Sequence, residues 1–171
     1  MTNVTEVTIK RQVFSNLDVL LAFGFGIGLI RPGPGTWGTI LAFPIHYVWL
    51  SVFSIQSLLI FWFVLLLVGV RICESAGSKL GVPDHSGIVI DEMVAFGLVL
   101  AILPNVIWLQ IVSFLIFRVF DIWKPMGIAR VDAQVKGGFG VMLDDLLAAL
   151  YTIIVSLGLF QLSVHFGWYH S

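Results

Sequence analysis

Three long stretches of this sequence contain no Asp, Glu, Lys or Arg, and they limit the possible fold more than any other feature. They run from Pro32 to Val70, from Met93 to Phe117 and from Leu146 to Ser171. A helix needs about 20 mostly apolar residues to cross the hydrocarbon core of a bilayer. Only 11% of the residues are charged, whereas soluble domains carry about a quarter. The stretches therefore predict an all-α, integral membrane protein.

The first stretch is long enough for two helices, predicted at Trp37–Val52 and Leu58–Arg71, and the last is long enough for one. The middle stretch contains Pro104, which breaks or kinks a helix and disfavours helical backbone at the preceding residue. It is either one kinked span or a hairpin of two short helices, Val89–Leu103 and Val106–Phe120. Only the hairpin places every Lys and Arg on one side of the membrane, and these residues prefer the cytoplasmic side.

We therefore expect a polytopic protein of about five helices, some short or re-entrant, with a polar site that faces the cytoplasm. The whole chain, 1–171, is expected to form one domain. Residues 1–19 do not resemble a signal peptide, because Asp18 interrupts the apolar run and no clear cleavage site follows, so they are predicted to stay as an interfacial segment. The net charge of −1 gives no field that attracts nucleic acid. The single cysteine, Cys73, excludes an internal disulfide.

This topology brings three polar, glycine-rich segments to the cytoplasmic surface: Gly24–Thr39, Asp84–Glu92 and Arg118–Asp145. The first reads GFGIGLIRPGPGTWGT. Backbone with so few side chains can approach a ligand closely and cradle an anion. Thr36 stands just before an apolar helix, where it could cap the helix or contact the anion. The alternative is a tight loop whose small residues ease helix packing.

Two pairs of adjacent carboxylates, Asp91-Glu92 and Asp144-Asp145, stand near the starts of apolar helices. Such groups repel one another and are costly near lipid unless a positive charge compensates them. A helix N-terminus stabilises a charge by a few tenths to about 1 kcal/mol, which explains one carboxylate better than two. Mg²⁺, which binds through a few carboxylates and substrate phosphate, would satisfy both pairs. His85 is a weaker candidate ligand.

Arg118, Asp121 and Lys124 are spaced i, i+3, i+6 and are predicted to share one helix face. They form either a structural ion-pair ladder or a phosphate clamp in which Asp121 orients or binds a metal. Lys136 stands beside a double glycine, from where it could touch a substrate. A metal that polarises a phosphoryl oxygen and activates water fits this set of residues, and the membrane setting points to a lipid phosphate.

Four blocks, GFGIGLIRPGPGTWGT, HSGIVIDE, FRVFDIWKP and VKGGFGVMLDDLLAA, resemble the phosphatidylglycerophosphatase A family in order and spacing. The resemblance covers roughly Leu20 to Leu157. It implies a small, Mg²⁺-dependent enzyme of the bacterial inner membrane. Such an enzyme removes the terminal phosphate of phosphatidylglycerophosphate and yields phosphatidylglycerol. Ile27, Ala95 and Gly127 depart from the family pattern but remove no charged group, so they put loop detail in doubt more than activity.

The resemblance and the residue chemistry together give one set of expected site residues. The expected catalytic carboxylates all match acidic positions of the family pattern: Asp91, Glu92, Asp121, Asp144 and Asp145. The metal is expected on four of these, namely Asp91, Glu92, Asp144 and Asp145. The expected contacts to the phospholipid substrate are Arg118, Lys124, Lys136, Gly24, Gly26, Gly35 and Thr36. No protein partner is predicted.

Two other functions are alternatives to this one. A phosphatidyltransferase could use the same metal chemistry, but the widely spaced aspartates of the CDP-alcohol transferases are missing. A channel or transporter would need polar residues at mid-membrane, and the predicted spans offer only His46, a few Ser and Thr, and Gln56 near a turn.

Overall fold

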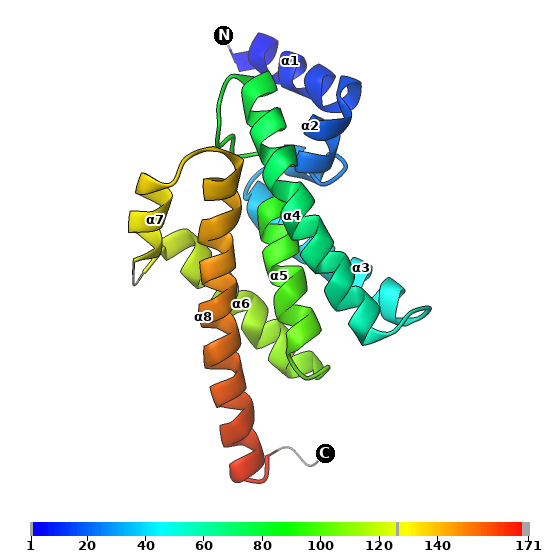
Figure 1. Cartoon of the computed structure of the whole chain (residues 1–171), viewed down its shortest axis with the longest axis vertical. Helices are drawn as coiled ribbons and strands as arrows, with labels where there is room; N and C mark the ends of the chain where they lie inside the picture. Colours follow the sequence, from blue (N-terminus) through cyan, green and yellow to red (C-terminus); the bar gives the residue numbers. More distant parts are fainter. Residues whose placement is uncertain (1, 126, 169–171) are drawn as a thin grey trace.

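A computed structural model describes residues 2–125 and 127–168, with side chains for 7–125, 127–130 and 134–168. This part of the chain is helical and contains no strand (Figure 1). Its elements, in chain order, are α1 (Thr2–Ser15), α2 (Leu17–Ala22), the short 3₁₀ helix η1 (Ile27–Leu29), α3 (Pro34–Leu50), α4 (Ile55–Leu80), α5 (Ile90–Ile102), α6 (Ile107–Trp123), α7 (Ile128–Gln134) and α8 (Gly137–His165).

Helix α5 is the centre of the bundle. It packs against α3, α4 and α8, which surround it in Figure 1. Ten of its 13 residues are buried, as expected for a helix that is apolar on every side. The helix begins with Ile90, so Asp91 and Glu92 lie in its first turn. The innermost helix therefore carries one of the two acidic pairs.

The predicted hairpin in the middle stretch is confirmed. Helix α5 ends at Ile102 and α6 begins at Ile107. Leu103 is extended, with φ −75° and ψ 154°, because the following proline excludes helical backbone there. Helix α4 is much longer than predicted: it continues past Arg71 to Leu80 and ends at Gly81, whose φ of +70° suits glycine.

Two of the described helices, α4 and α8, are long and apolar enough to cross a membrane. Helices α3, α5 and α6 have 17, 13 and 17 residues. At about 1.5 Å per residue they span roughly 20–25 Å, less than the roughly 30 Å hydrocarbon core. The prediction of about five spans therefore stays a prediction.

The loops that connect the helices lie at the two ends of the bundle (Figure 1). The α3–α4 and α5–α6 turns lie towards the end where α8 finishes. The start of α3, the α4–α5 loop and the segment around α7 lie towards the other end, with α1 and α2. The predicted arrangement of the three glycine-rich segments at one end is thus present in the fold.

Asp18, which interrupts the apolar N-terminal run, attaches α2 to the end of α4. Ser75 Oγ donates a hydrogen bond to its carboxylate at 2.6 Å, and Lys79 forms an ion pair with it. These contacts, the one with Lys79 first, hold the pKa of Asp18 below its usual value. The N-terminal helices are therefore fixed to the bundle by a polar contact.

The opposite end of the bundle contains a polar network that sequence reasoning missed. Gln110 on α6 is fully buried. It accepts a hydrogen bond from Tyr47 on α3, and its Nε2 donates to Asn105 Oδ1 at 2.8 Å. Nearby in α6, Ser113 and Ser156 of α8 are hydrogen-bonded at 2.8 Å. Such contacts connect helices where the surroundings are apolar. Because these groups use one another as partners, the network favours a structural role over a transport path.

Helices α4 and α5 approach closely where Gly97 faces the ring of Trp62. A Cβ on Gly97 would lie 2.5–2.6 Å from three ring atoms. We expect Gly97→Ala to lower the free energy of unfolding by about 1–3 kcal/mol, because a buried indole cannot move aside cheaply. Thermal unfolding in detergent measures the effect.

The matched control for this prediction is Gly69→Ala on α4. A Cβ there meets only the flexible end of Met142, at 3.0–3.1 Å, and a thioether chain adapts easily. The gain in helix propensity from glycine to alanine is common to both variants and cancels in the comparison. Equal shifts of the two unfolding midpoints would contradict the prediction.

Candidate active site

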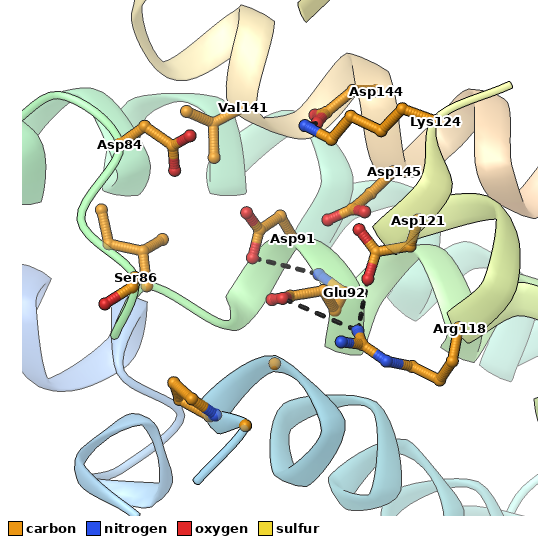
Figure 2. A pocket seen from close by; sticks show the side chains of 14 residues that line it. Asp84, Ser86, Asp91, Glu92, Arg118, Asp121, Lys124, Val141, Asp144 and Asp145 are labelled. Carbon is orange, nitrogen blue, oxygen red and sulfur yellow. Dashed lines mark hydrogen bonds and ion pairs between the residues drawn. The ribbon is translucent and has the colours of Figure 1, made fainter. Parts of the chain in front are cut away.

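A cavity of about 260 Å³ lies where the start of α3, the loop before α5, the first turn of α5, the end of α6 and the start of α8 meet (Figure 2). Its lining is strongly acidic. Six carboxylates face it: Asp84, Asp91, Glu92, Asp121, Asp144 and Asp145. The charged lining is completed by Arg118 and Lys124. The two acidic pairs predicted from the sequence therefore lie in one cavity, together with Asp121 and two of the predicted cations.

Three of these carboxylates are close enough to share one cation. Oxygen atoms of Asp91, Glu92 and Asp145 all lie within 4.8 Å of one another, and Figure 2 shows the three side chains beside one another in the cavity. Asp91 and Asp145 are 6% and 4% exposed. Negative charges this close and this far from water repel strongly. A divalent cation between them would remove that repulsion.

The environment of Glu92 also favours a cation. Its Oε2 is buried and has no hydrogen-bond partner within the described part of the chain. Its Oε1 occupies space that a side chain at position 35 would take, because a Cβ on Gly35 would lie 2.0 Å from this oxygen. Gly35 thus leaves room for the carboxylate. A buried acceptor oxygen without a donor is costly unless another group satisfies it.

Asp144 was predicted as the fourth metal ligand, and the structure gives it a different neighbour. Lys124 forms an ion pair with it, and their side chains are 26% and 10% exposed. Lys124 is the residue that caps α6, in left-handed backbone with φ +46°. It therefore leaves the helix face that it was predicted to share with Arg118 and Asp121, and its side chain reaches across to α8. Metal ligation by Asp144 stays a prediction.

Arg118 joins α6 to the acidic centre. Its Nη1 forms an ion pair with Asp121, lies 3.9 Å from Glu92 Oε1 and donates a hydrogen bond to Thr39 Oγ1 at 3.3 Å. Arg118 and Asp121 share one helix face, as their i, i+3 spacing predicted. Since one guanidinium contacts α3, α5 and α6, its charge is held beside the carboxylates in a fixed position.

Of the glycine-rich segment Gly24–Thr39, only Gly33, Pro34 and Gly35 line the cavity. Gly24 and Gly26 lie outside the lining. A Cβ on Gly24 would be 3.2 Å from Val89 Cγ2, and Gly26 has left-handed backbone with φ +97°. These two glycines therefore serve packing and chain reversal in the structure, and their predicted contact with the substrate stays a prediction.

Thr36 also lies outside the lining and is not the N-cap of α3, and its predicted contact with the substrate stays a prediction. The N-cap of α3 is Gly33, and Pro34 occupies the first helical position. Proline is suited to that position because its missing N–H would be unsatisfied there anyway. The helix consequently starts before Thr36, which lies within its first turn.

Lys136 lies beside the main cavity. It lines a smaller one, of about 60 Å³, whose wall includes Asp84 and Val141, and both of these also line the main cavity. Its predicted contact with the substrate stays a prediction. Sequence reasoning did not single out Asp84 or Ser86, which lie in the exposed loop before α5 and have no helical pattern to mark them.

His85 and Glu74 have structural contacts. His85 Nδ1 accepts a hydrogen bond from the Gly87 N–H at 3.0 Å, and burial and Arg31 lower the pKa of this histidine. Its ring stacks on Phe23 at a centroid distance of 5.5 Å. Glu74 accepts a hydrogen bond from the Gly138 N–H at the start of α8. Both side chains shape the loops around the cavity.

Comparisons with known proteins show which family this chain resembles. A family model described as phosphatidylglycerophosphatase A matches residues 20–160. The chain is 44% identical over 148 residues to phosphatidylglycerophosphatase A of Haemophilus influenzae, covering 86% of this chain and 91% of that protein. It is 35% identical over 162 residues to phosphatidylglycerophosphatase A of Escherichia coli K12, covering 94% and 91%.

A third relative, from Bacteroides thetaiotaomicron, is 36% identical over 156 residues, covering 85% of this chain and 94% of that protein. Its name assigns it provisionally to the phosphatidylinositol-3-phosphatases. No solved structure matches the chain.

Proposed function

The chain belongs to the phosphatidylglycerophosphatase A family, and from this we propose that it hydrolyses the terminal phosphate monoester of phosphatidylglycerophosphate to give phosphatidylglycerol. The observation that carries the proposal is the convergence of Asp91, Glu92 and Asp145 beside the guanidinium of Arg118. A phosphate monoester is doubly charged and needs both a cation and nearby positive side chains. The cavity offers a place for each.

Mg²⁺ is the cation proposed for this site. Asp91, Glu92 and Asp145 would hold it, with Asp144 as the predicted fourth ligand. Carboxylate oxygens suit Mg²⁺, which also keeps waters and binds substrate phosphate. When bound, it would polarise a phosphoryl oxygen and make a bound water more acidic. The unsatisfied Oε2 of Glu92 supports this assignment.

The protein's own side chains would orient the phosphate and handle the protons. Arg118 and Lys124 would offset the negative charge of the phosphoryl oxygens, and the backbone at Gly33–Gly35 leaves space for the headgroup. Water oxygen forms the new bond to phosphorus as the bond to the glycerol oxygen breaks. The attacking water gives up a proton to a cavity carboxylate, and the departing glycerol oxygen takes up a proton from solvent water. The products are inorganic phosphate and phosphatidylglycerol.

We further propose that the bundle lies in the inner membrane of a bacterium with about five membrane helices and the cavity at the cytoplasmic side. Apolar side chains are exposed in rows along the outer faces of the helices. On α6 they recur at every fourth residue: Ile107, Ile111, Leu115 and Val119. On α4 they include Ile60, Val64 and Val68. Soluble monomers rarely expose apolar patches of this extent, whereas lipid chains would cover them.

Phosphate release by the purified protein in detergent tests the proposal. The substrates are phosphatidylglycerophosphate, phosphatidic acid and phosphatidylinositol 3-phosphate, each with Mg²⁺ or with EDTA. We expect release that is fastest from phosphatidylglycerophosphate, stops in EDTA and returns when Mg²⁺ is in excess. No release from any lipid would exclude a lipid phosphatase, and undiminished release in EDTA would exclude the cation. Assaying CMP release in parallel tests the phosphatidyltransferase alternative.

A further inference from the structure

An apolar hollow lies on the outer side of α6, next to the acidic cavity. Its volume is about 420 Å³, and it is lined by Leu115, Arg118, Val119, Ile122 and Trp123. The four apolar side chains are all exposed, from 54% for Val119 to 79% for Trp123. The hollow therefore opens outwards, to the surroundings of the bundle.

Arg118 belongs to both the hollow and the cavity. Its charged end contacts Asp121 and Thr39 on the cavity side. An arginine can cover apolar surface with its methylene stem while its charged group remains in a polar site. Arg118 thus separates the acidic cavity, which suits a phosphate, from the apolar hollow, which suits a hydrocarbon chain. A molecule that occupied both would need a phosphate and an aliphatic chain next to each other.

We propose that the hollow receives an acyl chain of the lipid substrate while its phosphate monoester lies in the acidic cavity. The inference rests on the proposed phosphatase function and adds the position of the lipid's apolar part. The substrate would then reach the site sideways, from the bilayer across the outer face of α6. Leu115, Val119 and Ile122 would decide how the chain lies, and Arg118 would contact the phosphate end.

The exposed apolar face of α4 does not have this continuity. Val64 on α4 is 51% exposed. However, no described residue of α4 lines the acidic cavity. That face suits ordinary contact with bulk lipid. An acyl chain gains little by moving from bilayer hydrocarbon to a protein hollow, because lipid tails are as apolar as the side chains. The hollow would therefore orient the lipid more than tighten its binding.

Blocking the hollow should consequently affect catalysis on the lipid. Val119→Trp would fill it, and a displaced acyl chain would misplace the phosphate. Since small misplacements of reacting groups slow reactions strongly, we expect kcat/KM for phosphatidylglycerophosphate to fall by about tenfold or more. The matched control is Val64→Trp, which adds the same side chain at an equally exposed valine and should change kcat/KM by less than about twofold. Equal kcat/KM values for the two variants would overturn the inference.

The thermal unfolding midpoint shows whether Val119→Trp folds. If it does not, a second measurement on the wild-type protein tests the same inference. Wild-type protein in detergent is illuminated with phosphatidylglycerophosphate that carries a diazirine on one acyl chain, and the labelled peptides are identified. We expect labelling of α6 around Val119 that unlabelled phosphatidylglycerophosphate abolishes and phosphatidylcholine does not. Labelling spread equally over α4 and α6, without competition, would mean bulk lipid contact and would overturn the inference.

The two proposals fail in different ways. Wild-type protein that releases no phosphate from the lipid would overturn both the phosphatase function and the acyl-chain site. Wild-type protein that releases phosphate, with Val119→Trp equal to its control and uncompeted labelling, would overturn only the acyl-chain site.

Discussion

Asp91→Asn is expected to lower the rate of phosphate release from phosphatidylglycerophosphate by about a thousandfold or more. The change keeps the size of the side chain but removes the charge from one of three carboxylates that lie within 4.8 Å of one another. The proposed cation would stabilise the transition state by several kcal/mol, and each 1.36 kcal/mol corresponds to tenfold in rate. Steady-state phosphate release in detergent, measured across Mg²⁺ concentrations, checks the expectation.

The matched control is Asp18→Asn, which makes the same chemical change in an ion pair with Lys79. Asp18 lies outside the lining of the cavity, so this variant should keep near wild-type kinetics. Asp144→Asn is assayed beside them. The Mg²⁺ concentration that this variant needs for half-maximal rate shows whether Asp144, the partner of Lys124, contributes to cation binding. A rate for Asp91→Asn close to that of Asp18→Asn would remove the acidic centre from the mechanism.

Gly35→Ala is expected to slow phosphate release by about a hundredfold while the protein stays folded. The added Cβ would lie 2.0 Å from Glu92 Oε1 and 3.3 Å from Arg118 Nη1. Glu92 would have to move, and its carboxylate would leave the position that it shares with Asp91 and Asp145. Displacements of about 1 Å at a reacting centre can cost about a hundredfold. Kinetics and the thermal unfolding midpoint are measured on the same preparation.

Gly158→Ala is the control for this change. Gly158 is also a helical glycine, in α8, and a Cβ there would meet nothing within 4 Å. Alanine favours helix over glycine by up to about 1 kcal/mol, so this variant should be at least as stable as wild type and fully active. If Gly35→Ala were as active as Gly158→Ala, the close approach of Glu92 to α3 would have no catalytic meaning.

The helical pattern followed from the sequence where local chemistry decided it. Pro104 and the extended Leu103 separate α5 from α6 as predicted, because the restriction that proline imposes on its neighbour is local. The length of α4 was predicted too short, although Gly81 marks its end. The helix continues through Arg71 and Lys79, and Lys79 is held by Asp18, which is 61 residues away in the sequence. A contact at that separation leaves no local signal.

The acidic part of the site was predictable, because adjacent carboxylates beside apolar helices repel one another and are costly unless a positive charge compensates them. The roles of the glycines were not. Gly24, Gly26 and Gly35 look alike in the sequence, yet only Gly35 lies on the cavity, beside Glu92. The sequence shows where a side chain is absent. Only the folded structure shows which neighbouring group occupies the space that the absent side chain leaves. Asp84 and Ser86 were missed for a related reason: their segment was predicted at this surface, but only the tertiary structure shows which of its side chains line the cavity.

The shortness of α5 has a consequence for how deep the chemistry lies. A helix of 13 residues is about 20 Å long, and the hydrocarbon core is roughly 30 Å thick. Suppose that the α5–α6 turn lies at the outer surface of the hydrocarbon core. Asp91 and Glu92, at the other end of α5, then lie about 10 Å below the inner surface of that core. A substrate phosphate would then descend into the leaflet, and the bilayer would be locally thinned around the enzyme, so membrane thickness itself would become a variable that controls turnover.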